Sequence, residues 1–200
     1  RDEYIQRMDV TIDLAQDQTA TITERIEYHF PQGQLRHGIF RDIPEEYQRD
    51  GNNYSLRYRI LGVTRDGATE PYQLSDQGNA KRIKIGRGDV FIADAHTYTI
   101  TYQTRRAINT FPDHRELYWN VTGNEWPVPI LAASVTVNGP QPATKAVCYV
   151  GRFGSTSQAC TTSLMAENFT ASILSALDSQ EGLTIVVGYP REAFTSPPLL

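Results

Sequence analysis

The clearest strand pattern in this chain is the stretch TYTITYQT, residues 97–104. Tyr98, Ile100 and Tyr102 alternate with threonine and glutamine, so the apolar side chains share one face and the polar side chains share the other. A strand of this kind packs one face against a core and leaves the other in water, which is typical of antiparallel sheets. The stretch therefore predicts an antiparallel β-protein.

The same alternation recurs along most of the chain. Residues 8–14 and 20–30 are separated only by the short polar segment Gln16-Asp17-Gln18, which predicts a hairpin. Residues 54–63 alternate until the phase slips at Gly62, which predicts a bulge. The other segments with strand alternation are 81–85, 117–121, 131–137 and 183–189.

The segment ENFTASILSALDSQEG, residues 167–182, fits two patterns. Phe169, Ala171 and Ile173 alternate as in a strand, whereas Phe169, Ile173 and Leu177 also fit one face of a helix. The β-branched and aromatic residues favour the strand.

About ten short strands and little helix predict an all-β fold, an antiparallel β-sandwich of general immunoglobulin or fibronectin-like architecture. We expect one domain over residues 1–190. The last residues, 191–200, are expected to be an extended tail or linker.

Composition and charge restrict the classes of function. The formal net charge is −4 and the pI is about 5.6. A surface for nucleic acid requires clustered lysine and arginine, so no nucleic-acid partner is expected. No apolar run approaches the roughly 20 residues that a membrane helix requires, so we expect no such helix within residues 1–200.

The common catalytic signatures are missing from the sequence. It contains no GxSxG elbow, no HExxH zinc motif and no glycine loop of the phosphate-binding type. The four histidines are scattered without ligand spacing, and surface or strand-edge positions fit them better than metal binding. The sequence therefore predicts no catalytic residue, no metal and no cofactor.

The two cysteines, Cys148 and Cys160, flank a stretch rich in glycine, serine and threonine, which indicates a turn or loop. Their spacing suits neither a CxxC redox pair nor a four-ligand zinc site. Two interpretations remain, a pair of buried thiols or one disulfide that closes the loop. We favour the disulfide, in an extracytoplasmic setting.

Both tryptophans lie in LYWNVTGNEWPVPI, residues 117–130. Trp119 is in phase with Leu117 and Val121, so it is expected on the buried face, with its indole nitrogen bonded to a backbone acceptor. Trp126 precedes a segment with two prolines, which cannot pair as a central strand. We expect Trp126 to close one end of the sandwich; the alternative is an aromatic platform for a sugar or peptide.

Two charged residues occupy positions where the alternation requires apolar side chains. Glu24 lies between Ile22 and Ile26, and Arg41 lies between Ile39 and Ile43. An isolated buried charge is costly, so we predict that Glu24 and Arg41 meet in a partly buried, bidentate pair that sets strand register. The alternative is a bulge or bend that turns each side chain outward.

Six segments together resemble a known family. They are ITERIEYHF (22–30), HGIFRDIP (37–44), HTYTITYQT (96–104), ELYWNVTGNEWPVPI (116–130), CYVGRFGSTSQAC (148–160) and EGLTIVVGYP (181–190). In this order they resemble the domain-of-unknown-function 2207 family (DUF2207), a group of predicted membrane proteins of bacteria. The resemblance implies a signal peptide upstream of Arg1, membrane anchoring downstream of Leu200 and a position of this domain outside the cytoplasmic membrane. It implies no activity and no catalytic residue.

These observations support an interaction or structural module at the cell envelope. Its partner is expected to be an envelope protein or a glycan of unknown identity. One alternative is a carbohydrate- or peptidoglycan-binding module, which requires exposed aromatic residues around a groove. A second alternative is an envelope enzyme of unrecognised type.

Overall fold

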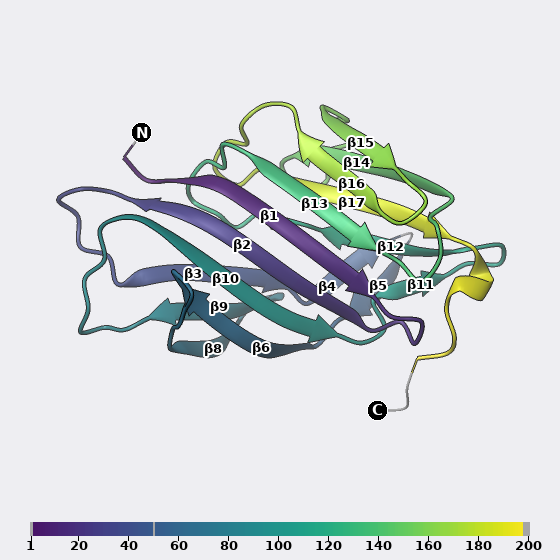
Figure 1. Cartoon of the computed structure of the whole chain (residues 1–200), viewed down its shortest axis with the longest axis horizontal. Helices are drawn as coiled ribbons and strands as arrows, with labels where there is room; N and C mark the ends of the chain where they lie inside the picture. The colour runs from purple at the N-terminus through teal and green to yellow at the C-terminus, as the bar shows by residue number, and fades with distance from the viewer. Residues whose placement is uncertain (1, 50, 198–200) are drawn as a thin grey trace.

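The computed structural model of this protein describes residues 2–49 and 51–197, and nearly all of its regular structure is β-strand. The largest sheet has eight strands (Figure 1). Their order is β15 (Cys160–Leu164), β16 (Phe169–Ile173), β13 (Ala133–Asn138), β1 (Tyr4–Leu14), β2 (Ala20–Phe30), β10 (Asp94–Thr104), β6 (Tyr58–Arg65) and β7 (Ala68–Thr69).

Three smaller sheets complete the fold. The four-stranded sheet has the order β11 (Ile108–Thr110), β12 (Arg115–Asn120), β17 (Gly182–Tyr189) and β14 (Lys145–Gly151). The three-stranded sheet has the order β3 (Gly38–Pro44), β9 (Ala80–Gly86) and β8 (Tyr72–Gln77). The two-stranded sheet pairs β4 (Glu46–Arg49) with β5 (Asn52–Ser55).

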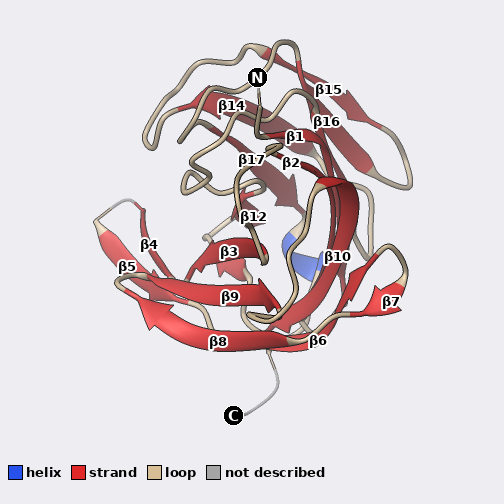
Figure 2. Ribbon diagram, turned by 90° about the vertical axis from the view of Figure 1, so that its left-hand side faces the viewer, coloured by secondary structure: helices blue, strands red, loops and turns tan. Residues whose placement is uncertain are grey.

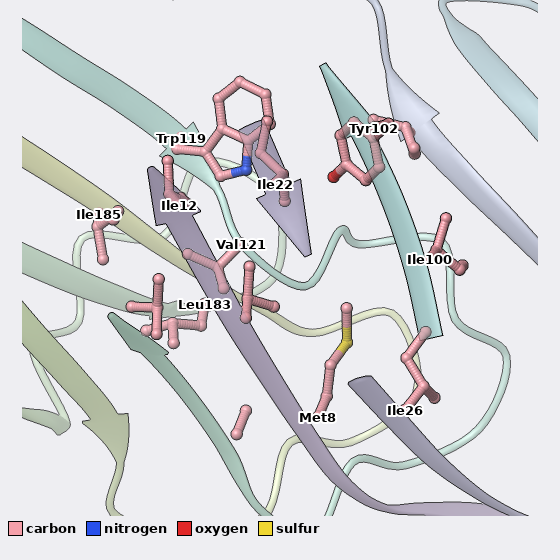
Figure 3. Close-up of a cluster of buried hydrophobic side chains, with 14 of the residues drawn as sticks. Met8, Ile12, Ile22, Ile26, Ile100, Tyr102, Trp119, Val121, Leu183 and Ile185 are labelled. Atoms are coloured by element: carbon pink, nitrogen blue, oxygen red, sulfur yellow. The ribbon is translucent and has the colours of Figure 1, made fainter. Parts of the chain in front are cut away.

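The smaller sheets lie behind the large sheet in Figure 1, and Figure 2 shows the large sheet curving around them. One continuous apolar core fills the space between these layers. Its central side chains come from both sides of the sandwich, as Figure 3 shows. They include Met8, Ile12, Ile22, Ile26, Ile100 and Tyr102 from the large sheet and Trp119, Val121, Leu183 and Ile185 from the opposite layer. The predicted all-β, sandwich-like fold is confirmed.

The hairpin predicted at the beginning of the chain is present. β1 pairs with β2 in antiparallel register, with Ile12 opposite Ile22. The predicted slip of phase is also present, because Gly62 pairs with Thr101 whereas Ile60 pairs with the next residue, Tyr102. The extra residue of this bulge is therefore Leu61, which is exposed.

Two local features differ from what the sequence predicted, and a third decides between the strand and the helix in the segment after residue 167. β1 pairs in parallel with β13, so the sheet is not purely antiparallel. The alternating segment 54–60 is divided between β5 and β6, which belong to different sheets. Residues 169–173 form strand β16, as the β-branched and aromatic side chains predicted.

The segment after Pro190 was expected to be an extended tail, and this is wrong for its first residues. A 3-10 helix spans Arg191–Ala193, and the Phe194 ring is buried 5.4 Å from the ring of Tyr189. The Thr195 amide donates to the Gln16 carbonyl over 2.8 Å. Burial of the apolar Phe194 ring in the core is favourable, and this gain in free energy outweighs the tendency of the segment to extend. Residues 198–200 lie outside the described residues.

Within the described part of the chain, no helix has the length and apolar character needed to cross a membrane.

Candidate functional site

The charged pair predicted from the sequence lies at the centre of the molecule. The Arg41 Nε is 2.6 Å from Glu24 Oε1, and its Nη2 is 2.8 Å from Glu24 Oε2. The arginine side chain is 1% exposed and that of the glutamate is 0% exposed, so the pair is fully rather than partly buried. The Tyr102 hydroxyl also donates to Glu24 Oε2 over 2.5 Å. Neither residue is turned outward by a bulge.

Burial and the contact with Glu24 together set the pKa values of Arg41 and Tyr102. Burial alone would lower the pKa of Arg41, but the adjacent Glu24 carboxylate outweighs it and holds that pKa above its ordinary value. Burial raises the pKa of Tyr102 well above its ordinary value, and the Glu24 carboxylate raises it further. Arg41 therefore stays charged and Tyr102 stays neutral at physiological pH.

The loop after β12 closes over this pair. The indole nitrogen of Trp126 donates to the Thr122 carbonyl over 2.8 Å, and the Arg41 guanidinium lies 5.9 Å from the centre of the Trp126 ring. Gly123 has a φ of +77°, and a Cβ at this position would lie 2.7 Å from Arg41 Nη1. Trp126 is 3% exposed, so it lies inside the fold rather than on an exposed platform.

Trp119 is buried as predicted, but the expected backbone partner of its indole nitrogen is absent. The Trp119 Nε1 atom is buried and has no hydrogen bond to another described group. The rings of Tyr47 and Tyr58 lie 6.4 and 6.3 Å from the Trp119 ring. The indole is therefore held by packing against aromatic rings rather than by a hydrogen bond.

The two cysteines form a disulfide, with their sulfur atoms 2.07 Å apart. Cys148 belongs to β14 of the four-stranded sheet and Cys160 begins β15 of the large sheet. The bond therefore joins edge strands of two different sheets and closes the loop between them. The Ser155 hydroxyl donates to the Val150 carbonyl over 2.7 Å and orders the same loop.

This loop forms one rim of a groove of about 630 Å³. One wall is the outer face of the three-stranded sheet, represented by Asp42 and Arg82. The floor is the outer face of the four-stranded sheet, where Asn120, Thr184 and Tyr149 lie in one row across three paired strands. The groove is therefore formed by the faces of two sheets that turn away from the core.

Aromatic side chains are distributed along the groove. Tyr47 and Tyr118 pack edge to face with their ring centres 6.2 Å apart, and both line it. Tyr149 projects from the floor and is half-buried. Phe153, in the disulfide-closed loop, is 85% exposed. A large apolar side chain this exposed at the rim of a hollow is typical of a binding surface.

Two of the charged side chains that line the groove pair with each other. Arg82 Nε and Nη2 donate to the two carboxylate oxygens of Asp42 over 2.8 and 2.9 Å. This hydrogen-bonded carboxylate, with a smaller contribution from Glu125, raises the pKa of Arg82 above its ordinary value. The Arg82 guanidinium also lies 4.5 Å from the centre of the Phe40 ring.

The groove was not predicted from the sequence. Thr184 has the pattern of an ordinary solvent-facing position of a strand, and strand β14, which carries Tyr149, was not predicted. The available signal was Phe153, an aromatic residue in a loop rich in glycine, serine and threonine. Among residues 2–49 and 51–197 the structure contains no group of three or more His, Cys, Asp or Glu side chains that would hold a metal ion.

The fold resembles domains of larger solved enzymes. Leukotriene A4 hydrolase of yeast, in complex with bestatin, matches 94% of this chain with a TM-score of 0.61 and 9% identity, over 29% of its own length. An M1 zinc metallopeptidase of Deinococcus radiodurans matches 94% of this chain with a TM-score of 0.50 and 11% identity, over 43% of its own length. At such identities the likeness shows the fold alone.

Sequence comparison gives a nearer relative. The uncharacterized protein YciQ of Escherichia coli K12 is 39% identical over 132 residues, which are 64% of this chain and 21% of that protein. This chain thus corresponds to about a fifth of the length of its relative. The model of the family described as the N-terminal domain of a predicted membrane protein (DUF2207) matches residues 4–189. The chain therefore belongs to the DUF2207 family, as its N-terminal domain.

Proposed function

We propose that this domain is a non-catalytic interaction module on the outer side of the cytoplasmic membrane, and that it binds its partner in the groove between the two smaller sheets. The membrane anchor of the protein lies beyond Leu200. The observation that carries the proposal is the groove itself, with Phe153 exposed at its rim. Exposed aromatic side chains around a concave, polar surface are a common arrangement in binding sites.

Two further observations support the extracytoplasmic side. A structural disulfide persists in oxidising compartments and is rare in the bacterial cytoplasm. The family is described as the N-terminal domain of a predicted membrane protein.

The redox state of Cys148 and Cys160 in cells tests the compartment. Cells that express the full-length protein are quenched with acid, denatured and treated with a thiol reagent of large mass. Without reductant, we expect the native protein and the Cys148→Ser/Cys160→Ser variant to carry the same number of reagents. After reduction, the native protein should carry two more than this variant. The Cys148→Ser variant, in which Cys160 has no disulfide partner, should carry one more and is the control for reagent access. Two additional reagents on the native protein without reductant would show that the domain is cytoplasmic and contradict the proposal.

Site-specific photo-crosslinking tests the groove. A benzophenone amino acid is placed at Phe153 in the full-length protein, and at Phe91 as a matched control. Phe91 is 60% exposed and lies outside the groove. We expect crosslinked products from position 153 that are absent from position 91. Equal products from both positions, or none from either, would argue against a binding groove.

A further inference from the structure

We infer that the ligand of this groove is a glycan, a chain of uncharged sugar rings with many hydroxyl groups. This inference rests on the proposed function, because it assigns a ligand class to the same groove. Three properties of the groove support it: its floor presents side chains, its aromatic rings are accessible in part or in full, and its polar groups are mostly neutral.

The first property is that the floor of the groove presents side chains. Asn120, Thr184 and Tyr149 occupy opposite positions on β12, β17 and β14, so the floor is a sheet face. The main-chain groups between these strands are already paired with one another. An extended peptide that joins a sheet needs the free main-chain groups of a strand edge. Recognition at this floor must therefore come from side chains, which favours a ligand that carries its own dense set of hydrogen-bonding groups.

The second property concerns the aromatic rings. Tyr149 on the floor and Phe153 on the rim line the same groove. The face of a sugar ring carries C–H bonds with partial positive charge, and the face of an aromatic ring is the negative part of its quadrupole. Stacking of sugar rings on Tyr149 and Phe153 would remove apolar surface of both partners from water.

The third property concerns the polar side chains. Gln48, Gln77 and Asn79 line the groove, are exposed, and make no side-chain hydrogen bond to other described residues. A carboxamide offers a donor and an acceptor side by side, which matches two neighbouring hydroxyl groups of a sugar.

Two arginines line the groove: Arg82 is paired with Asp42, and Arg152 is exposed. The carboxylates of Glu46 and Glu125 line it as well, so the groove carries no cationic cluster for phosphate or sulfate. These features together favour a neutral glycan over an anionic ligand.

Calorimetric titration of this chain with its disulfide intact tests the inference. The probes are cellotetraose, maltotetraose and chitotetraose, with purified peptidoglycan sacculi in a separate pull-down. We expect at least one probe to bind, and the Tyr149→Ala and Phe153→Ala variants to lose affinity by on the order of tenfold, as for central aromatic residues of interfaces. Tyr149→Phe keeps the stacking ring and should retain most of the affinity.

The controls separate binding from folding. Phe91→Ala removes an exposed ring outside the groove and should leave the affinity unchanged. Thermal unfolding of each variant shows whether it is folded. If no probe binds, or if Tyr149→Ala and Phe153→Ala are folded and bind as tightly as the native chain, the glycan inference is overturned. If position 153 nevertheless crosslinks to a protein, the proposed function is retained without the glycan inference. If position 153 crosslinks to nothing, both the proposed function and the glycan inference are contradicted.

Discussion

Glu24 and Arg41 form a bidentate ion pair with no significant exposure to solvent, and the two residues come from different sheets. Glu24 lies on β2 of the large sheet and Arg41 on β3 of the three-stranded sheet. A bidentate contact between the carboxylate and the guanidinium restricts the relative position of the two strands. We therefore expect the pair to help set how these sheets are placed against each other.

Removal of one member should be strongly destabilising. We expect Glu24→Gln to lower the free energy of unfolding by about 3 kcal/mol, because the Arg41 charge would remain buried without its partner. The Glu24→Gln/Arg41→Met double variant should lose less than the sum of the single variants, since it leaves no isolated charge. Urea unfolding of the four proteins measures this cycle. Additive losses would mean that the two residues are not coupled.

The disulfide should contribute to stability and to the shape of the groove. Cys148 and Cys160 are 12 positions apart in the sequence. Loss of a bond that closes a loop of this length should lower the free energy of unfolding by about 3 kcal/mol in the chain-entropy model. The Cys148→Ser/Cys160→Ser variant is compared with the native chain in urea, with and without reductant. Equal unfolding midpoints of the oxidised native chain and the variant would refute the expectation.

Gly123 should tolerate no side chain, for two separable reasons. Its φ of +77° disfavours residues with a Cβ, and that Cβ would lie 2.7 Å from Arg41 Nη1. Gly67, with a φ of +83° and no atom within 4 Å of its added Cβ, is the matched control for the backbone effect.

Gly67→Ala should therefore cost only the left-handed backbone penalty, about 1 kcal/mol. Gly123→Ala should cost clearly more, because the contact with the buried arginine is added. Thermal unfolding measures both variants. Similar losses for the two would show that Arg41 accommodates the methyl group.

The two tryptophans should report a buried environment. Trp119 is 1% exposed and Trp126 is 3% exposed, so the fluorescence emission of the folded chain should be blue-shifted and resistant to quenching by iodide. The variants Trp119→Phe and Trp126→Phe each leave one indole and separate the two signals. Emission of a water-exposed indole from Trp119→Phe would contradict the closed position of Trp126 and favour an aromatic platform.

His114 should make stability depend on pH. Its hydrogen bond to Asp113, supported by Glu116, raises the pKa of the imidazole above 6.5. A raised pKa in the folded state means that this stabilisation is fully present below the unfolded pKa, and is lost as pH rises through the folded pKa. The unfolding midpoint should therefore fall as pH increases from 6.5 upward. In His114→Gln this part of the pH dependence should disappear; an unchanged profile would assign it to other groups.

Much of the fold follows from alternation that is local in the sequence. The β1–β2 hairpin, the bulge beside Gly62 and strand β10 were predicted because a period of two places side chains on opposite faces without reference to the rest of the chain. The Glu24–Arg41 pair was predicted for a related reason. Two charged side chains at core-facing positions are costly to bury separately, so direct contact between them is one of few low-energy arrangements.

The tertiary structure decided what alternation does not encode. The parallel pairing of β1 with β13, the packing of Phe194 and the unpaired Trp119 nitrogen depend on which segments meet in space. The groove has the same origin. An outward-facing Tyr149 has the same sequence pattern whether it meets bulk water or the outer face of a second sheet. The sequence by itself therefore determined which side chains face the core, whereas only the assembly of the sheets determined which solvent-facing side chains share a site.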